Sequence, residues 1–568
     1  MTPSNSSAAA SSPTPASPTK RRPHPSRKRI SVSSLVMYRN GSVYSPADPL
    51  ATAMLIDGDT VAWIGQEAAA AALIDERMTV VELDGALVAP AFFDSHVHLS
   101  ELGASLEQVD LREARSTSEL LGAVRAAAVR APGQPILGFG WDETDWDTPV
   151  LPSVNELADA AAGADVYLAR VDVHSALVAG PSAPDRPGSS TAHVTGDLHR
   201  TIRHRATNYD DATRTRYLRS ALEHYVQHGY AGVAEMAAPQ ISGRRDAELL
   251  EELVATDPAS YPLVRLYWAE LATSVAEAEA LARSFGAAFA GLGGDLNIDG
   301  SIGSRTAALR AEYSDAPGNT GALMLTAEQI SAHVVACTQA GVQAGFHVIG
   351  DAGADAATAG FRLAAAEVGA EALQRLGHRL EHVEMVDDDV VATLLEAGVT
   401  VSLQPAFDAK WGGPGGLYAS RLGTERTQRM NEVGRFLAAG IPVCLGSDAP
   451  VTEVDPWGSV KACLNLSTDS ARISARAAFL AHTRSGYRAA GVDIPFGGQL
   501  VPGGEATFAV WSASELMVQT PDSRVASWST DARAGTPLLP VMENEFPRCL
   551  RTVRAGRVLY AEDASVVA

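Results

Sequence analysis

The sequence predicts an α/β protein in which a TIM-like (β/α)8 barrel carries a small β-sandwich domain formed by both chain ends. From about residue 85 to residue 490, apolar strand-like segments alternate with alanine-rich amphipathic segments. This alternation is typical of βαβ units around a parallel sheet. Several of the apolar segments end in histidine, aspartate or glutamate. A (β/α)8 barrel places its chemistry at the carboxyl ends of its strands, so this pattern favours the barrel.

Short strand-like segments separated by glycine turns occur at both ends of the chain. Residues 53–56 and 61–64 flank an Asp-Gly-Asp turn, and residues 506–511 and 551–560 repeat the same pattern near the carboxyl end. Alternating apolar residues interrupted by such turns predict hairpins. We therefore expect the two chain ends to meet in one small β domain.

These changes of pattern set the expected domain boundaries. Residues 34–88 and 495–562 are expected to form the composite β-sandwich, and residues 89–494 the barrel. The stretch from about residue 105 to 215 fits no regular βα period and contains an aromatic, acidic run at 140–146. We interpret this stretch as an inserted cap between the first and second strands of the barrel.

Composition and charge exclude several classes of function. The chain has 568 residues, of which 46% are apolar, so it can bury a large core, and a purely disordered or binding role is disfavoured. Its formal net charge of −22 repels nucleic acid and anionic membrane surfaces. A membrane span would need a run of about 18 apolar residues, which the sequence lacks. We expect a small-molecule substrate, with no nucleic acid and no membrane as partner, and we leave a homodimer open.

Residues 1–33 differ from this average. They are rich in Ser, Pro and Ala, and carry lysines and arginines but no acidic residue. Such a composition cannot build a packed core, so we expect a disordered basic tail, with a docking or targeting role as the alternative. The four cysteines show neither CxxC spacing nor the density of a disulfide scaffold. Their pattern fits a reducing compartment and a cytoplasmic location.

Five residues at predicted strand ends have the chemistry of metal ligands. His96 and His98 follow an apolar run, and the period of two along an extended chain points both imidazoles to one side. An isolated His-x-His pair is more often incidental. His347, His382 and Asp448 end later strands, where a buried core histidine is the alternative. Imidazoles with one carboxylate favour Zn²⁺, or less specifically Fe²⁺, Mn²⁺ or Ni²⁺, because Ca²⁺ and Mg²⁺ prefer oxygen ligands.

The motifs around these residues carry a resemblance to a known family. The segments at 90–98, 347–352, 379–382 and 446–450 read PAFFDSHVH, HVIGDA, RLEH and GSDAP. Together, in this order, they resemble the amidohydrolase superfamily. Gly140-Trp141, the run DGSIGSRTA from Asp299 and the following Tyr313 resemble the branch that includes N-substituted formamide deformylases. The resemblance covers roughly residues 33–562.

The resemblance implies a metal-dependent hydrolase. It places His96 and His98 on strand one, His347 on strand five, His382 on strand six and Asp448 on strand eight, around one or two divalent ions. Such an ion lowers the pKa of bound water from about 15.7 toward ~7. Asp448 would take the proton of that water, and an imidazole, assigned to His382, would help stabilise the oxyanion. The expected reaction is cleavage of the C–N bond of an amide or N-substituted formamide.

One feature of the family is absent. Many relatives bridge two metals with a carboxylated lysine on strand four, and here the predicted strand at 294–299 contains no lysine. Glu235, at the end of the predicted second strand, is the best carboxylate for a bridging or supplementary metal ligand. A glutamate hydrogen-bonded to loop backbone or paired with an arginine is an equally supported alternative.

Four further residues are candidates for substrate binding. Arg305 could clamp a carbonyl or carboxylate through its planar guanidinium, together with Asp299. A structural Asp299–Arg305 pair that shapes the loop is the alternative. Trp141 and His174 lie in the predicted cap, where an aromatic wall would favour a partly apolar substituent. Trp146 is better explained by packing of the insertion.

Three other functions remain open on the sequence. A cyclic amide or imide hydrolase and an ester hydrolase would use the same scaffold and the same ligands. A catalytically silent, metal-stabilised binding protein belongs to a different class. The silent alternative predicts a missing ligand, and all five ligand positions are filled.

Overall fold

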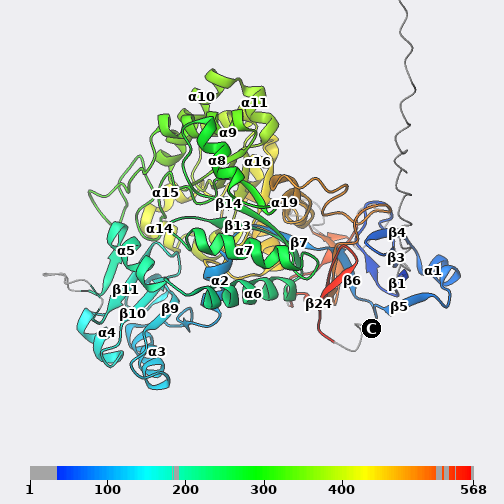
Figure 1. Cartoon of the computed structure of the whole chain (residues 1–568), viewed down its shortest axis with the longest axis horizontal. Helices are drawn as coiled ribbons and strands as arrows, with labels where there is room; N and C mark the ends of the chain where they lie inside the picture. Colours follow the sequence, from blue (N-terminus) through cyan, green and yellow to red (C-terminus); the bar gives the residue numbers. More distant parts are fainter. Residues whose placement is uncertain are drawn as a thin grey trace, which may run out of the picture. The chain divides into compact units, whose positions relative to one another are not determined.

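The barrel is an eight-stranded parallel sheet. The computed structural model describes residues 35–181, 183, 191–519, 528–529, 537–543 and 545–563. In spatial order the sheet runs β7 (Phe92–Val97), β13 (Tyr230–Ala237), β14 (Leu263–Trp268), β15 (Phe289–Leu292), β16 (Gln343–Val348), β17 (Arg379–His382), β18 (Thr400–Leu403) and β19 (Val443–Leu445). Figure 1 labels the first three of these strands. A bridge between Val97 and Ala449 joins the first strand to the segment after the last. The predicted TIM-like barrel is confirmed.

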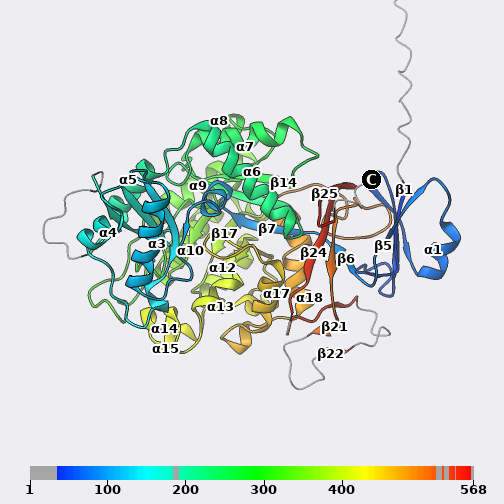
Figure 2. The ribbon, with the colours of Figure 1, turned by 90° about the horizontal axis from the view of Figure 1, so that it is seen from below.

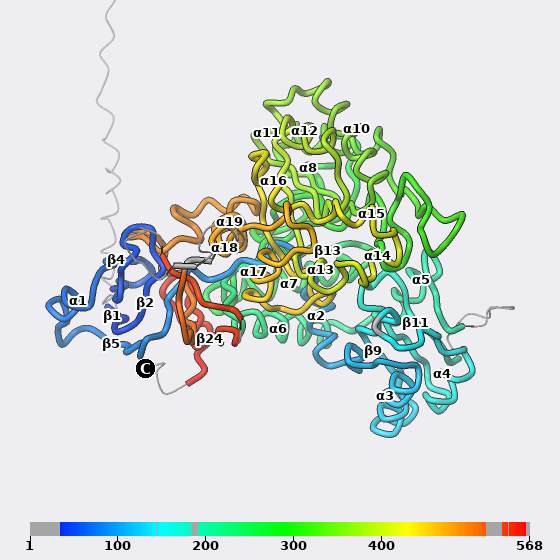
Figure 3. The backbone as a smooth tube through the Cα atoms, turned by 180° about the vertical axis from the view of Figure 1, so that it is seen from behind, coloured from blue at the N-terminus to red at the C-terminus, as the bar shows by residue number. Residues whose placement is uncertain are grey.

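Helices follow most of the strands and surround the sheet (Figures 1 and 3). Because helices cover one face of a closed parallel sheet and side chains fill the other, its strands are buried on both faces, as every residue of β13 is buried. The principal barrel helices are α6 (Asp211–Gln227), α7 (Arg244–Thr256), α8 (Val275–Arg283), α9 (Ala327–Ala340), α10 (Asp351–Val368) and α12 (Asp388–Ala397). Local sequence sets where they begin. Thr326 and Gln329 form a capping box at the start of α9.

The two chain ends share one sheet. Its strand order is β2 (Ser42–Val43), β6 (Leu87–Pro90), β20 (Phe508–Ser512), β24 (Arg548–Arg554) and β25 (Arg557–Ala561). A second sheet consists of β4 (Thr60–Gly65), β3 (Ala53–Asp57), β1 (Leu35–Arg39) and β5 (Met78–Glu82). One buried cluster contains Tyr38, Val88, Phe508 and Val553, so both ends contribute to the same core. Figure 2 shows the blue and red segments side by side. The expected β domain from both ends is confirmed, and its boundaries at 34–88 and 495–562 stay a prediction.

Between β7 and β13 the chain forms a separate α/β layer (Figure 2). Its sheet has the order β12 (His193–Thr195), β11 (Ser175–Ala179), β10 (Val166–Arg170), β9 (Ile136–Trp141) and β8 (Val109–Asp110). Its helices are α3 (Thr117–Arg130), α4 (Val154–Ala160) and α5 (Gly196–Ala206). Leu120, Trp141, Leu157 and Leu168 belong to a core of its own. This layer occupies the stretch predicted as the inserted cap.

The fourth barrel strand lies earlier than the sequence analysis placed it. The structure ends β15 at Leu292, whereas the predicted strand covers 294–299. Gly294 has a φ of +75°, which interrupts the extended backbone at this point. Only a single bridge, from Asn297 to His347, continues the pairing beyond it. Residues 295–299 therefore lie at the carboxyl end of the strand, where a barrel places its functional groups.

Two other expectations concern the chain outside the barrel. The predicted basic tail, residues 1–33, lies outside the described residues. None of the helices in the described ranges combines the length and apolar character needed to cross a lipid bilayer.

Candidate active site

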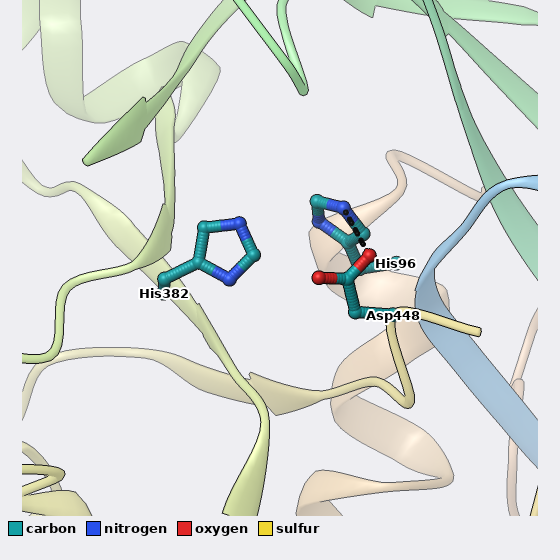
Figure 4. Close-up of side chains that lie close together, drawn as sticks. All are labelled: His96, His382 and Asp448. Carbon is teal, nitrogen blue, oxygen red and sulfur yellow. Dashed lines mark ion pairs between the residues drawn. The ribbon is translucent and has the colours of Figure 1, made fainter. Parts of the chain in front are cut away.

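The five predicted ligands meet at one end of the barrel. His96 and His98 stand at the end of β7, His347 in β16, His382 at the end of β17, and Asp448 just after β19. The barrel brings these carboxyl ends together, although the residues are up to 352 positions apart, from 96 to 448. Figure 4 shows His96, His382 and Asp448 facing one another.

A sixth residue, Asp295, completes the cluster. Its Oδ2 lies 3.1 Å from Nε2 of His98, and its Oδ1 lies 3.5 Å from Nε2 of His96 and 3.8 Å from Nδ1 of His347. Asp448 Oδ1 lies 3.4 Å from Nε2 of His96 and 3.3 Å from Nε2 of His98. The sequence analysis missed Asp295. Its signal was an aspartate directly after a Gly-Gly pair at a strand end, which the misplaced fourth strand concealed.

Each of three histidines has one ring nitrogen fixed as a hydrogen-bond donor. Nδ1 of His96 donates to Glu381 Oε2 at 2.9 Å, Nδ1 of His382 donates to Gln404 Oε1 at 2.8 Å, and Nε2 of His347 donates to the Gly300 carbonyl at 3.2 Å. Because those partners only accept, the lone pair of each imidazole stays on the other nitrogen, within the cluster. These contacts give three imidazoles the tautomers that metal binding requires.

Glu381 is held in place by an arginine. Arg379 Nε donates to Glu381 Oε1 at 2.6 Å, and both side chains are fully buried. Burial alone would raise the pKa of Glu381, but the Arg379 guanidinium and His96 outweigh it and hold the pKa at about 2. Glu381 is therefore ionised at neutral pH and orients His96 without being part of the cluster.

Burial and neighbouring charges shift the pKa values of the cluster residues in opposite directions. Burial lowers the pKa of His347, but the Asp295 carboxylate outweighs it and raises the pKa to about 9. Burial and the neighbouring imidazoles lower the pKa of His382 to about 3. For Asp448, burial opposes ionisation, but His96 and His98 prevail and lower its pKa. Opposite charges thus converge in a small buried volume.

The donor atoms of the cluster fit a divalent cation. His96 Nε2, Asp295 Oδ1 and Asp448 Oδ1 are buried and have no hydrogen-bond partner within the described part of the chain. A polar atom buried in this way costs free energy unless it is paired. Three overlapping groups of these side chains have ligand atoms within 4.8 Å of one another: His96, His382 and Asp448; His96, His98 and Asp295; and Asp295, His347 and His382. Nitrogen and carboxylate donors at this spacing are the ligands of transition metals.

Two of the predicted ligands occupy strained backbone conformations. His382 has a φ of +71° and Asp448 a φ of +55°, in the left-handed region that non-glycine residues seldom adopt. The β-branched Val383, at +45°, follows His382 in the same region. Such strain persists where the surrounding structure over-determines it, and it gathers at functional sites.

Glu235 is buried beside the cluster but stands outside the three groups. Its Oε2 accepts a hydrogen bond from the backbone of Leu99 at 2.7 Å, as in the backbone-bonded alternative. Burial raises its pKa to about 8, with the imidazole of His98 acting in the opposite direction. Its role as a supplementary ligand stays a prediction.

The predicted substrate-binding residues occupy different surroundings. Asp299 accepts hydrogen bonds from the backbone of Ala308, Ile349 and Gly350, which shapes the loop, and burial raises its pKa to about 6. Arg305 pairs with Asp315 at 2.7 Å rather than with Asp299, and the arginine does not line the cavity described below.

The two candidates in the insertion also differ. Trp141 is fully buried in the core of the insertion, where its indole donates to the Leu168 carbonyl at 2.9 Å. His174 lies at the cluster, with its ring 5.8 Å from that of His347. Of the four candidates, only His174 lines the cavity.

A cavity lies against the cluster. Its walls combine metal-site residues, a loop of the insertion and an aromatic segment. They are His98, Asp172, Val173, His174, Asp295, Ser301, Ile302, Gly303, His347, Ile349, His382, Glu384, Phe407, Trp411, Leu417, Tyr418, Asp448 and Val451. The insertion contributes residues 172–174, so it forms part of the wall, as expected of a cap.

Comparison with known proteins decides the family. The amidohydrolase family matches residues 79–560 of the chain. This chain belongs to that family. Among its relatives, the protein LONG AFTER FAR-RED 3 of Arabidopsis thaliana is 26% identical over 520 residues, covering 84% of this chain and 87% of the relative. A putative amidohydrolase of Bacillus subtilis, YtcJ, is 24% identical and covers 66% of this chain and 73% of the relative.

A solved structure supports the same assignment. The crystal structure of an uncharacterised metal-dependent hydrolase from Pyrococcus furiosus has a TM-score of 0.64 and 26% identity. The match covers 84% of this chain and 98% of that one. Family membership, this likeness and the ligand cluster together make the protein a metal-dependent amidohydrolase that uses a divalent ion.

Proposed function

We propose that this amidohydrolase uses Zn²⁺, as one or two ions, to hydrolyse the C–N bond of an amide, and that N-substituted formamides are its first class of substrate. The observation that carries the proposal is the cluster of imidazole nitrogens and carboxylate oxygens facing the cavity. Such mixed nitrogen and oxygen ligands suit zinc. The resemblance of 140–141, 299–307 and Tyr313 to formamide deformylases supports the substrate class.

His96, His98, His347, His382, Asp295 and Asp448 would hold the metal. When bound, a divalent ion activates water and polarises the scissile carbonyl. Asp448 takes a proton from the attacking water on a carboxylate oxygen and passes it to the leaving nitrogen, so it acts first as base and then as acid. Asp295 belongs to two of the three ligand groups, so it is the best carboxylate for sharing between two ions.

His174 would orient the substrate. Desolvation lowers its pKa to about 4, so the ring is neutral at pH 7 and can donate a hydrogen bond to a carbonyl oxygen without adding charge. Phe407 and Trp411 present apolar surface to the rest of the substrate. Asp172 and His174 come from the insertion, which would help exclude water.

Elemental analysis and a substrate panel test this proposal. Wild-type protein, chelator-stripped protein and stripped protein reloaded with Zn²⁺ would be assayed on N-substituted formamides, N-acyl amines, cyclic imides and esters. We expect one or two equivalents of zinc, with amide turnover lost on stripping and restored on reloading. Turnover confined to cyclic imides or esters would contradict the proposed amide substrates and make the protein an imide or ester hydrolase. A protein that binds metal but hydrolyses nothing would make it a binding protein.

The cytoplasmic location also belongs to this proposal. All four cysteines are buried and free of disulfides, which suits a reducing compartment. Fractionation of cells that express the tagged protein tests it, and recovery with an exported fraction would contradict it.

A further inference from the structure

An aromatic wall extends from the metal site along the cavity. Phe407 stacks on the ligand His382, with ring centroids 5.9 Å apart and an interplanar angle of 11°. Phe407 contacts Trp411 at 5.1 Å, and Trp411 contacts Tyr418 at 6.2 Å. These rings come from α13 (Pro405–Trp411) and α14 (Leu417–Leu422), and all three are buried. The aromatic wall, defined by Phe407, Trp411 and Tyr418, is therefore a chain of ring contacts that begins at the predicted metal ligand His382.

Glu384 stands at this wall with an unused carboxylate oxygen. The residue is 3% exposed and follows His382 by two positions. Its carboxylate interacts with the hydroxyl of Tyr418, but Oε2 has no hydrogen-bond partner among the described residues. The ion pairs of the described chain include none with Glu384. A buried carboxylate with neither a cation nor a full set of donors is costly, so a missing partner is expected.

The other carboxylates of the cavity have their compensation. The lining contains Asp172, Asp295, Glu384 and Asp448 but, within the described chain, no lysine or arginine. Asp172 pairs with Arg170 at 3.1 Å and accepts hydrogen bonds from Ser301 and Ser304. Asp295 and Asp448 lie among the metal-site imidazoles. Glu384 is thus the carboxylate of the lining that has no arginine partner and belongs to none of the three ligand groups, although the imidazole of His347 acts against the burial that raises its pKa.

We propose that Glu384 and the aromatic wall form a subsite for an ammonium group of the substrate. An ammonium beside Glu384 would gain an ion pair and charge-assisted hydrogen bonds in a dry site. The faces of Phe407, Trp411 and Tyr418 would add cation–π attraction. Lys410 approaches Trp411, with its Nζ 5.4 Å from the ring, but it does not line the cavity. The inference rests on the proposed amidase function for the reacting bond and names the substrate class as amides that carry a compact ammonium group.

Binding of two matched probes tests the subsite without turnover. Zinc-loaded protein would be titrated with propylammonium chloride and with 1-propanol, followed by ligand-observed NMR. We expect the ammonium to bind at least about tenfold more tightly than the alcohol, which corresponds to about 1.4 kcal/mol. In Glu384→Gln the preference should disappear while zinc content stays unchanged. Equal binding of the two probes to the wild type would overturn the proposal, even if the variant fails to fold.

Asp408→Asn serves as the matched control. Asp408 lies on the same helix as Phe407 and Trp411, accepts a hydrogen bond from the Ser467 backbone at 2.7 Å, and does not line the cavity. Its variant should keep the preference for the ammonium. A preference that survives in Glu384→Gln would assign the cation to another group and overturn the proposal.

Matched substrates separate this inference from the proposed reaction. N-formyl-1,3-diaminopropane and N-formylbutylamine have the same length and differ in a terminal ammonium or methyl group. We expect kcat/KM to favour the diamine derivative in the wild type and the ratio to fall at least about tenfold in Glu384→Gln. If the protein binds the ammonium probe but hydrolyses neither formamide, the subsite is supported and the proposed amidase function is wrong. If the protein hydrolyses both formamides with equal kcat/KM, the amidase function is supported and the ammonium subsite is wrong.

Discussion

Two buried charged clusters border the same cavity, and they differ in how their charges are balanced. In the first, at the edge of the insertion, Arg170 pairs with Asp142 at 2.5 Å, with Glu143 at 2.8 Å and with Asp172 at 3.1 Å. Arg421 pairs with Glu143 at 2.8 Å and with Asp315 at 2.6 Å. Arg305 also pairs with Asp315 at 2.7 Å, so three guanidinium groups serve these four carboxylates within the described chain.

The second cluster, at the barrel end, contains imidazoles and two carboxylates but no arginine or lysine among its described members. Four of its atoms lack hydrogen-bond partners among the described residues: the three named above and Nδ1 of His98. The first cluster is compensated by the polypeptide and serves structure. The carboxylates of the second are compensated by imidazoles such as His347, and a bound cation would replace those protons, so this cluster suits metal chemistry. The comparison shows that the source of the compensating charge, arginine in one cluster and imidazole in the other, distinguishes the metal site better than buried charge as such.

The largest effect should come from Asp448→Asn. An amide cannot take up the proton that the carboxylate accepts, so kcat should fall by about 10²–10⁴-fold. Steady-state kinetics on the best amide substrate, with zinc measured on the same sample, would check this. Wild-type kcat in a zinc-loaded variant would contradict the role of Asp448 as the base.

Arg170→Met should instead reduce stability. Removing one partner of a buried ion pair leaves uncompensated carboxylates and costs about 3–5 kcal/mol in the free energy of unfolding. Denaturant unfolding of the zinc-loaded wild type and variant measures this change in the free energy of unfolding. Arg216→Met is the control, because its pair with Glu107 is exposed and should contribute less than about 1 kcal/mol. Loss of zinc in Arg170→Met at unchanged stability would show that the two clusters are not separate.

Metal removal should destabilise the barrel end and take up protons. Free metal at about a thousand times its Kd stabilises the native state by about 4 kcal/mol, so chelation should lower the thermal unfolding temperature. Burial opposes protonation of His347, but Asp295 raises its pKa to about 9, so the metal-free protein holds this proton at pH 7. Metal binding must displace it, and affinity should rise between pH 7 and 9. Calorimetric titration with metal in buffers of different ionisation enthalpy measures the number of protons released. Metal binding without proton release would contradict the prediction.

Glu381→Gln should have the smallest effect on the metal site. The amide keeps the shape but removes the charge that holds Nδ1 of His96, so metal affinity should fall by about 10–100-fold. Competition with a zinc chelator measures the change. Glu432→Gln, a buried glutamate paired with Arg435 away from the cavity, should leave the affinity unchanged. Equal losses in both variants would point to general destabilisation.

Local pattern accounts for much of the architecture and of the ligand cluster. Apolar runs ending in polar residues predicted the barrel, because strands buried on both faces must be apolar and their ends face the site. The His-x-His spacing placed His96 and His98 together, since alternate residues of a strand share one side. The fourth strand was misplaced, because Gly294 interrupts it in a way that periodicity does not reveal. Asp295 was missed for that reason.

The sequence by itself determined the class of fold, the union of the chain ends in one small β domain, and five residues suited to hold a metal. These features depend on local spacing and on residue chemistry, which can be read along the chain. Only the tertiary structure decided that Asp295 joins the cluster, that Arg305 pairs with Asp315, and that Trp141 packs inside the insertion. It also decided that Glu384 meets an aromatic wall from two later helices. Such outcomes depend on which distant side chains are buried together, because a buried oxygen without a hydrogen-bond or ion-pair partner costs free energy.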